Sequence, residues 1–262
     1  MAKYKPYAVC TPPFDPVSGG IRVMWGLYGW LLAKGQIVYV NAKYEDRNFI
    51  AIYPEIYHGN PAGANIVVRY ILNKPGVMAN FGTAGPTTFE KTDRIFVFSK
   101  IFDTFGVDDD HLMFLPVLNL HLFKDHGKKR TKKCVFFGKY GSVSNLKVHY
   151  SHPKDCIPID RKFATDQKAL ADLLNECQVM YGYDSVSAMY EVARLCGCRV
   201  VIIPDGSYTK KEFSQYEPGM NGISWDVKEK VELDVKKFRK HYIKMIKLFD
   251  RKMDRFIALT QR

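Results

Sequence analysis

The sequence lacks the features that identify several classes of protein. It has no run of the roughly 18 to 20 apolar residues that a membrane-spanning helix needs, and its first residues do not follow the pattern of a secretory signal peptide. Its six cysteines are scattered, without the paired Cys-x-x-Cys spacing of a zinc site or the density of a disulfide framework. These absences predict a cytoplasmic protein whose cysteines are reduced core residues.

The sequence also lacks two common nucleotide-binding motifs, and its one match to a metal-binding motif is in the wrong context. The sequence contains neither the G-x-G-x-x-G dinucleotide fingerprint nor a G-x-x-x-x-G-K-[ST] phosphate loop. Asp108-Asp109-Asp110 superficially matches the D-x-D metal motif, but the triplet precedes a hydrophobic segment, whereas a metal-binding D-x-D should follow one. Turn chemistry therefore favours a solvated turn at this triplet.

The chain does have a globular composition and a marked basic excess. Of its 262 residues, 47% are hydrophobic and 14% aromatic, which is enough for one large or two small cores. The formal net charge of +12 implies an anionic partner, which is a nucleic acid, a phosphorylated ligand or a membrane surface. Much of the excess lies in residues 228–262, so the charge is a local feature.

Residues 178–205 predict a βαβ unit of a parallel sheet. The first apolar run stops at Asp184-Ser185, two residues that cap helix N-termini, so a helix is expected to begin there. Gly197 ends this helix, and the β-branched run from Arg199 onward is typical of a buried parallel strand. The apolar face of the helix is formed by Val186, Met189, Tyr190 and Ala193.

A polar strip lies on the opposite face of the same helix. Ser187, Glu191 and Arg194 are spaced i, i+4 and i+7, and Ser185 precedes them at the helix N-terminus. Free N–H groups and the helix dipole favour an anion such as phosphate there, and a carboxylate one turn further in suits ribose hydroxyls. The alternative is a Glu191–Arg194 pair on a solvated face, and the spacing is compatible with both.

In the first half, a loop after the predicted strand 7–11 is rich in proline and glycine. It contains Asp15 and the run Ser18-Gly19-Gly20, and it leads into a largely apolar helix over 21–34. The glycine pair either lets the backbone approach a phosphate closely or forms a tight turn that packs the helix on the sheet.

Glu55 and His58 follow the predicted strand 49–53, at the strand end where ligands bind in open α/β sheets. Either residue is a candidate general base on an acceptor hydroxyl, or can orient a sugar. The alternative for the carboxylate is a capping role at the next helix. That helix is predicted from Asn60 through Ile71 to Pro75-Gly76. Its Arg69 is a candidate phosphate contact or a helix-surface charge.

The remaining pattern predicts further elements of an α/β protein. Strands are expected at 94–98, 111–117, 134–137 and 155–159, a helix at 166–177, and a charged linker at 122–133. A long basic helix is predicted from Asp226 onward. Its apolar stripe is formed by Val235, Phe238, Tyr242, Met245 and Phe249. The lysine-rich faces of this helix are predicted to be exposed to solvent. Either the helix only packs through its apolar stripe, or its lysines also contact anionic lipid.

Three patches, in chain order, resemble GT-B glycosyltransferases: the glycine loop Ser18-Gly19-Gly20, the segment 54–76, and the Gly138-Lys139 turn followed by the helix that carries Ser185, Ser187 and Glu191. The stretch Cys196-Gly197-Cys198-Arg199-Val200 resembles the CG-C/T-P-V return of their nucleotide-sugar segment, with Arg199 in place of the usual proline. Residues 54–61 (PEIYHGNP) and 67–76 (VVRYILNKPG) resemble the amino-terminal half of a group of bacterial and viral enzymes of this type. Gly138-Lys139 resembles the G-K/R-G turn that begins their carboxy-terminal domain.

The resemblance implies an α/β protein of GT-B type, with two Rossmann-like parallel-sheet domains facing a cleft and a long C-terminal helix. Residues 1–122 would form the acceptor-side domain, and residues 123–262 would form the nucleotide-sugar-binding domain with the terminal helix. The implied activity is transfer of a sugar from a UDP- or GDP-sugar to a hydroxyl of a glycan or lipid-linked acceptor.

The resemblance also implies roles for individual residues. The donor would be held by Ser18, Gly19, Gly20, Gly138, Lys139, Tyr183, Ser185, Ser187 and Glu191. Glu191 would hold the ribose, and Lys139, with Lys147 as a looser second cation, would offset the diphosphate charge. No metal and no other cofactor would be required. If the enzyme inverts, Asp15, Glu55 or His58 is the base, and if it retains, no dedicated base is needed.

A non-catalytic nucleotide-binding or nucleic-acid-binding protein is the alternative that the basic charge supports. Nucleic-acid binding needs a basic face with exposed aromatic residues for stacking. Here the charge is concentrated in one terminal helix and the aromatic residues lie in core-like runs. We therefore expect no nucleic-acid partner. Peripheral contact with an anionic membrane is compatible with a lipid-linked acceptor.

Overall fold

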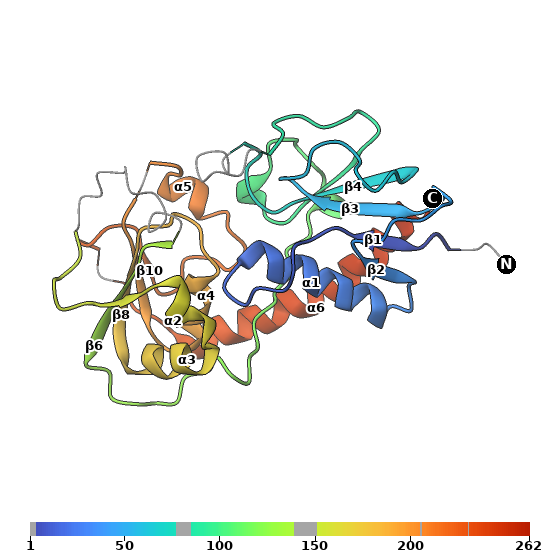
Figure 1. The fold of residues 1–262 in the computed structure, drawn as a ribbon. Helices are drawn as coiled ribbons and strands as arrows, with labels where there is room; N and C mark the ends of the chain where they lie inside the picture. The colour runs from blue at the N-terminus through green and yellow to red at the C-terminus, as the bar shows by residue number, and fades with distance from the viewer. Residues whose placement is uncertain (1–3, 77–84, 139–150, 205, 230) are drawn as a thin grey trace. The chain divides into compact units, whose positions relative to one another are not determined.

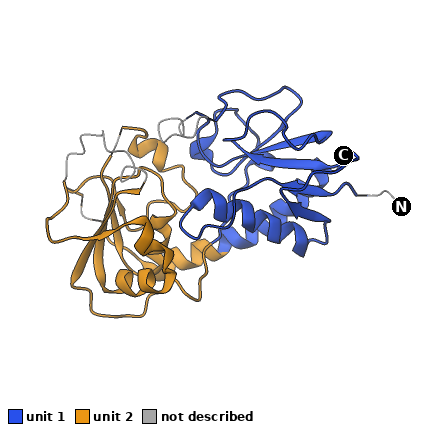
Figure 2. Ribbon diagram, viewed as in Figure 1, with its two compact units in different colours: residues 1–117, 244–262 blue, residues 118–243 orange. Residues whose placement is uncertain are grey.

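The computed structural model describes residues 4–76, 85–138, 151–204, 206–229 and 231–262, whose fold is traced in Figure 1. The chain divides into two compact units (Figure 2): unit 1 contains residues 1–117 and 244–262, and unit 2 contains residues 118–243. Each unit holds one five-stranded parallel sheet. The predicted α/β class with two parallel-sheet, Rossmann-like domains is therefore confirmed at this level.

The sheet of unit 1 has the strand order β2-β1-β3-β4-β5. Ala8 of β1 pairs with Tyr39 of β2 on one side and with Ala51 of β3 on the other, both in parallel. The central strands are almost completely buried, as their continuous apolar runs require. The strands are β1 (Tyr7–Val9), β2 (Val38–Val40), β3 (Ile50–Pro54), β4 (Ile66–Ile71) and β5 (Arg94–Val97).

Two helices pack within unit 1. The helix α1 (Gly19–Ala33) buries Val23, Met24, Leu27 and Leu31. The last part of α6 (Val235–Thr260) lies beside it, with the ring centroids of Trp30 and Phe249 5.5 Å apart. The hydroxyls of Tyr7 and Thr260 are 2.7 Å apart, which ties the end of α6 to the first strand.

The sheet of unit 2 has the order β10-β9-β8-β6-β7. Taken in chain order, its first strand lies between the second and the third, and the fourth and fifth follow outward. This is the arrangement of unit 1, so the two units share one topology. The strands are β6 (Lys132–Phe136), β7 (Ile157–Ile159), β8 (Cys177–Gly182), β9 (Arg199–Ile202) and β10 (Ile223–Ser224).

The helices of unit 2 are short and mostly capped by side chains. Asp166 accepts a hydrogen bond from the N–H of Ala169 at the start of α3, where the sequence predicts a helix, and Thr209 forms a capping box with Glu212 at the start of α5. The helices are α2 (Arg161–Thr165), α3 (Gln167–Glu176), α4 (Met189–Leu195) and α5 (Lys210–Phe213).

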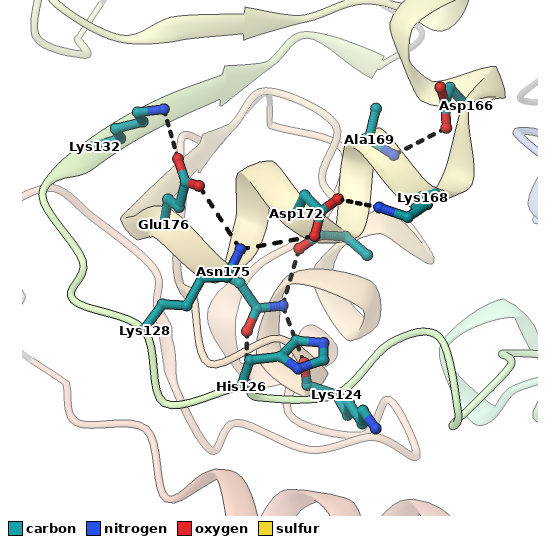
Figure 3. A network of polar contacts seen from close by, with 11 residues as sticks. Lys124, His126, Lys128, Lys132, Asp166, Lys168, Ala169, Asp172, Asn175 and Glu176 are labelled. Atoms are coloured by element: carbon teal, nitrogen blue, oxygen red, sulfur yellow. Dashed lines mark hydrogen bonds and ion pairs between the residues drawn. The ribbon is translucent and has the colours of Figure 1, made fainter.

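The segment predicted as a linker, 122–133, belongs to unit 2 and is fastened to α3 (Figure 3). The side chain of Asn175 is fully buried, donates from Nδ2 to the carbonyl of Lys124 at 3.0 Å, and accepts from the N–H of His126 at 2.7 Å. An ion pair of 2.6 Å joins Lys132 to Glu176. A single amide therefore satisfies the backbone of a segment that has no secondary structure at that point.

The predicted helix at 60–76 is wrong. Asn60 caps a turn instead: its Oδ1 accepts from the N–H of Ala64 at 3.1 Å, and its Nδ2 donates to the carbonyl of the same residue at 2.7 Å. Gly63 has a φ of +76°, which interrupts any helix there. The apolar run that follows is the central strand β4, and its β-branched residues suit that environment.

Two other elements differ from the sequence-based expectations. Residues 111–117 form one isolated bridge, between Leu112 and Val97, in place of a strand. The terminal helix begins at Val235 and not at Asp226, because the carboxylates of Asp226 and Glu229 bind backbone N–H groups in a turn. In the described part of unit 1 the chain also forms the 3₁₀ helices η2 (Lys100–Phe102) and η3 (Asp109–His111). Across the described ranges, no helix has both the length and the apolarity to cross a membrane.

Candidate functional site

Both sheets contain a topological switch point. In unit 1 the connections run in opposite directions on the two sides of β1 and β3, and in unit 2 the same holds for β6 and β8. Ligands of open α/β sheets bind beyond the carboxyl ends of such strands. The loops after these four strands are therefore the candidate ligand-binding regions of the two units.

In unit 1, the loop after β1 is closed by two polar side chains. The Oδ1 of Asp15 accepts from the N–H of Val17 at 2.8 Å and from that of Ser18 at 3.4 Å. Ser18 is the N-cap of α1 and accepts from the N–H of Ile21 at 3.4 Å. Gly19 and Gly20 are the first two residues of the helix. Four of the predicted site residues, Asp15, Ser18, Gly19 and Gly20, therefore lie together in the turn and the N-terminal cap of α1.

The glycine at position 20 is not demanded by its neighbours. A Cβ built on Gly20 would lie 3.5 Å from Cδ1 of Leu72, an ordinary van der Waals contact. Gly20 does not have a positive φ either. Packing alone would accept alanine at this position, which weakens the interpretation of the glycine pair as a purely structural turn.

The loop after β3 carries Glu55 and His58 in different environments. Glu55 is 5% exposed, and its Oε2 accepts from the N–H of Leu72 at 2.9 Å, just past the end of β4. His58 is exposed. The carbonyls on either side of it, those of Tyr57 and Gly59, accept from Arg69 at 3.1 and 2.5 Å.

Arg69 is 1% exposed and lies in the middle of a sheet. Its Nε donates to Asp93 at 2.7 Å, and its guanidinium lies 5.0 Å from the ring of Tyr53 and 5.1 Å from that of Phe89. The predicted roles as a helix-surface charge or a phosphate contact are wrong, because every side of the cation is engaged inside unit 1. Arg69 instead holds the loop that presents His58.

In unit 2, the loops after β6 and β8 touch one another. Gly138 has a φ of +58°, and a Cβ there would lie 2.6 Å from the Cβ of Asp184. Tyr183 stacks on Phe137, with centroids 5.3 Å apart and an interplanar angle of 23°. Gly138 and Tyr183, both predicted site residues, thus meet at the same switch point, while Lys139 and Lys147 lie outside the described residues.

A histidine that sequence reasoning missed joins this cluster. The hydroxyl of Tyr183 accepts from the N–H of Ser151 at 2.8 Å and lies 2.8 Å from Nδ1 of His152. Burial lowers the pKa of His152, which favours the neutral imidazole as an acceptor for the phenolic proton. The two side chains are 31 positions apart in sequence, and nothing in the local spacing around His152 signals the contact.

The helix after β8 begins later than predicted. The chain bends through residues 184–186, and α4 starts only at Met189, whose N–H donates to the Oγ of Ser187 at 3.2 Å. The hydroxyl of Tyr190 donates to the carbonyl of Asp184 and fastens this bend. The Tyr190 ring packs directly against Gly182, where a Cβ would lie only 2.4 Å from it. The ring therefore lies beneath residues 184–186, which form a bend where the sequence predicts a first helical turn. Ser185, in the bend, is buried.

Glu191 and Arg194, the part of the polar strip that lies in α4, are buried. Glu191 is 3% exposed, and its Oε1 accepts from the hydroxyl of Tyr216 at 2.6 Å. Burial, together with the Glu191 carboxylate, raises the pKa of Tyr216 well above its usual value and keeps it a donor. The alternative of a Glu191–Arg194 pair on a solvated face is therefore wrong. Tyr216 is a second residue that the spacing did not indicate.

Arg194 does not form an exposed pair with Glu191. It is fully buried, its Nη1 donates to the carbonyls of Gly219 at 2.7 Å and Asn221 at 3.1 Å, and its guanidinium lies 4.0 Å from the ring of Phe238. Burial lowers its pKa to about 10, so the side chain stays charged at neutral pH. Arg194 and Glu191 together order the segment 216–221 beneath α4.

Potential metal ligands are engaged by cations. In η3, Asp109 pairs with Lys252 at 2.7 Å and Asp110 with Arg255 at 2.7 Å. Over the described parts of the chain, no group of three or more His, Cys, Asp or Glu side chains is placed to hold a metal ion. The described residues therefore offer polar, backbone and aromatic groups for a ligand.

Comparison with known proteins does not assign a family. No protein-family model and no curated protein matches the chain. Among solved structures it matches the E. coli RcsC C-terminus, which contains a linker region and a phosphoreceiver domain, at 11% identity. That match covers 97% of this chain and 96% of the other with a TM-score of 0.25, a similarity too low to indicate fold or function.

Proposed function

We propose that this protein is a glycosyltransferase of GT-B type, which moves a sugar from a nucleotide-sugar donor to a hydroxyl of a glycan or lipid-linked acceptor. One observation carries the proposal. The segments that resemble this family follow β1 and β3 in unit 1 and β6 and β8 in unit 2. These are the strands beside which ligands bind in each sheet, so the resemblance falls where the topology expects a ligand.

In this proposal unit 2 binds the donor, a UDP- or GDP-sugar. Gly138, whose missing Cβ lets the loops after β6 and β8 meet at Asp184, is assigned to the donor by resemblance. Ser185 and Ser187 of the neighbouring loop are assigned to it in the same way, and Ser187 is the more exposed of the two. The stacked rings of Phe137 and Tyr183 pack the start of that loop against the end of β6. Lys139 is assigned to the diphosphate by resemblance, since an ammonium group there would stabilise the departing nucleoside diphosphate.

Glu191 is assigned to the ribose through an exchange of hydrogen bonds. In the structure the hydroxyl of Tyr216 donates a hydrogen bond of 2.6 Å to the carboxylate of Glu191. A ribose hydroxyl can donate the same kind of hydrogen bond, so it could take the place of Tyr216. In the donor complex we expect the Tyr216 hydroxyl to move away from the carboxylate. The segment 216–221, which Arg194 holds through three backbone carbonyls, is the part of unit 2 that would adjust.

On the acceptor side, His58 is the preferred base if the reaction inverts configuration. It is exposed, whereas Glu55 is buried and Asp15 closes the turn before α1. A base must reach the proton that it removes. Arg69 orders the backbone on both sides of His58, so this loop would present the imidazole in one position. A retaining reaction would use His58 only to orient the acceptor.

We expect the reaction to need neither a metal ion nor a resident cofactor. The resemblance assigns two kinds of group to the charge of the donor: the backbone N–H groups at the start of α1, at Ser18, Gly19 and Gly20, and the ammonium of Lys139. A helix of 15 residues contributes a positive dipole end at that position.

The test is nucleoside-diphosphate release from UDP-, GDP- and dTDP-sugars in the presence of a chelator. Gly20→Ala adds a methyl group that should hold the donor phosphate away from the backbone N–H groups. It should lower kcat/KM for the active donor about 10- to 100-fold, the loss expected when one hydrogen bond to a charged group can no longer form. Gly29→Ala is the matched control: Gly29 lies on the same helix with nothing within 4 Å of a built Cβ, so activity should be unchanged. Glu191→Gln keeps an acceptor for Tyr216 but removes the charge, and should raise KM.

Three results would contradict the proposal. If no donor is bound or hydrolysed, the nucleotide-sugar assignment fails. If a donor binds but no sugar leaves it under any acceptor condition, a non-catalytic nucleotide-binding protein is the better account. If Gly29→Ala impairs turnover as much as Gly20→Ala, the start of α1 has no special relation to the donor.

A further inference from the structure

The exposed side of α6 is a continuous basic face. At 100° per residue, six cationic side chains span an arc of about 100° on the side opposite the buried stripe. They are Lys236, Lys237, Lys240, Lys244, Lys247 and Arg251, and all six are exposed. The buried stripe consists of Phe238, Tyr242, Met245, Phe249, Met253 and Phe256.

The charge of this face is not compensated within the protein. Other basic residues of α6 have partners: Arg239 donates to the carbonyl of Leu120 at 3.0 Å, and Lys252 pairs with Asp109. In the described part of the chain, none of the six exposed cations forms an ion pair. The two acidic residues of the helix, Asp250 and Asp254, are both paired with Lys34, at 2.9 and 2.8 Å.

Two apolar side chains border the same face. Ile243 is 37% exposed and Leu248 is 45% exposed, and they lie at the two edges of the cationic arc. The aromatic residues of α6 are all on the buried side. Nucleic acids that stack on proteins need exposed aromatic rings, whereas lysines mixed with exposed aliphatic side chains are typical of helices that lie on anionic lipid.

We propose that residues 236–251 of α6 form a docking surface for an anionic membrane surface. The lysines and Arg251 would contact lipid phosphates, and Ile243 and Leu248 would enter the boundary between headgroups and acyl chains. Each cation near an anionic bilayer strengthens binding by a factor of about five. Six unpaired cations on one helix face are enough for reversible attachment without a membrane-spanning segment, and this inference is independent of the proposed sugar transfer.

The test is flotation of the full-length protein with vesicles of phosphatidylcholine alone or with about one-third phosphatidylglycerol. Binding should require the anionic lipid and should fall steeply as salt is raised. The variant Lys240→Gln/Lys244→Gln/Lys247→Gln should lower the partition constant about 100-fold, from three factors of five. The control Lys154→Gln/Lys162→Gln/Lys211→Gln removes the same charge from exposed, unpaired lysines of unit 2 and should change it less than about threefold.

Several outcomes decide the proposal. It is overturned if anionic vesicles bind no protein, if the control variant loses as much binding as the α6 variant, or if a labelled oligonucleotide binds more tightly than the vesicles and is released by the α6 substitutions. Thermal melting checks that each variant is folded. Should the triple variant melt early, Lys244→Gln alone must still weaken vesicle binding about fivefold, and failure to do so also overturns the proposal.

Discussion

Replacing Arg69 with methionine should destabilise unit 1 more than any surface substitution. The guanidinium is 1% exposed and pairs with Asp93, whose side chain is 4% exposed. Methionine fills a similar volume but leaves the Asp93 carboxylate buried without its partner. It also removes the donors to the carbonyls of Tyr57 and Gly59.

The expected loss in the free energy of unfolding is about 3–5 kcal/mol, the cost of leaving one member of a buried ion pair alone. The double substitution Arg69→Met/Asp93→Leu removes both charges, so only the two orphaned carbonyls remain. That double variant should lose about 1–3 kcal/mol, less than Arg69→Met by itself. The two substitutions are therefore expected to be strongly non-additive.

Urea unfolding followed by tryptophan fluorescence measures these losses. Of the three tryptophans, Trp25 and Trp30 lie in unit 1 and Trp225 lies in unit 2. In a Trp225→Phe background the signal reports unit 1 alone. The reasoning is refuted if Arg69→Met costs less than about 1 kcal/mol, or if the double variant loses the sum of the two single losses.

Two further predictions concern unit 2, whose unfolding is followed through Trp225. Gly197 has a φ of +82°, and a Cβ there would lie 2.0 Å from Nη2 of Arg130, so Gly197→Ala should cost about 3 kcal/mol, combining backbone strain with a displaced charged donor. Gly206→Ala, at a φ of +84° with nothing within 4 Å, should cost only about 1 kcal/mol, and equal losses would contradict the role given to Arg130. Burial lowers the pKa of His152 below its unfolded value, so the unfolded state binds the proton more readily and unit 2 should lose stability as pH falls from 7.5 to 5. His152→Gln should make the urea midpoint of unit 2 depend less on pH over this range. If the midpoint changes with pH as strongly as in the parent protein, His152 does not contribute to the pH dependence.

Much of the fold could be predicted from local pattern. Strands β1, β3, β5, β6, β8 and β9 and helices α1 and α3 lie within a few residues of the expected ranges. Each is marked by a continuous apolar run, a helical stripe or a capping side chain such as Asp166. The parallel pairing of β8 with β9 around α4 also follows from the predicted βαβ unit.

The errors arose where a local signal had two physical meanings. Asn60 is equally suited to cap a helix and to close a turn, and Gly63 at positive φ decided for the turn. Asp184-Ser185 reads as a helix cap, but the chain bends there because Tyr190 occupies the space beside Gly182. Both outcomes depend on neighbours that a short window does not contain.

For the candidate site, the sequence by itself determined which loops follow the strands and which polar residues they carry. That information is local, because strand ends, glycine turns and caps depend on residues a few positions apart. The tertiary structure alone decided what those side chains touch. Glu191 meets Tyr216, 25 positions away, and Tyr183 meets His152, 31 positions away. Burial and partnership depend on packing between distant segments, and no spacing along the chain encodes them.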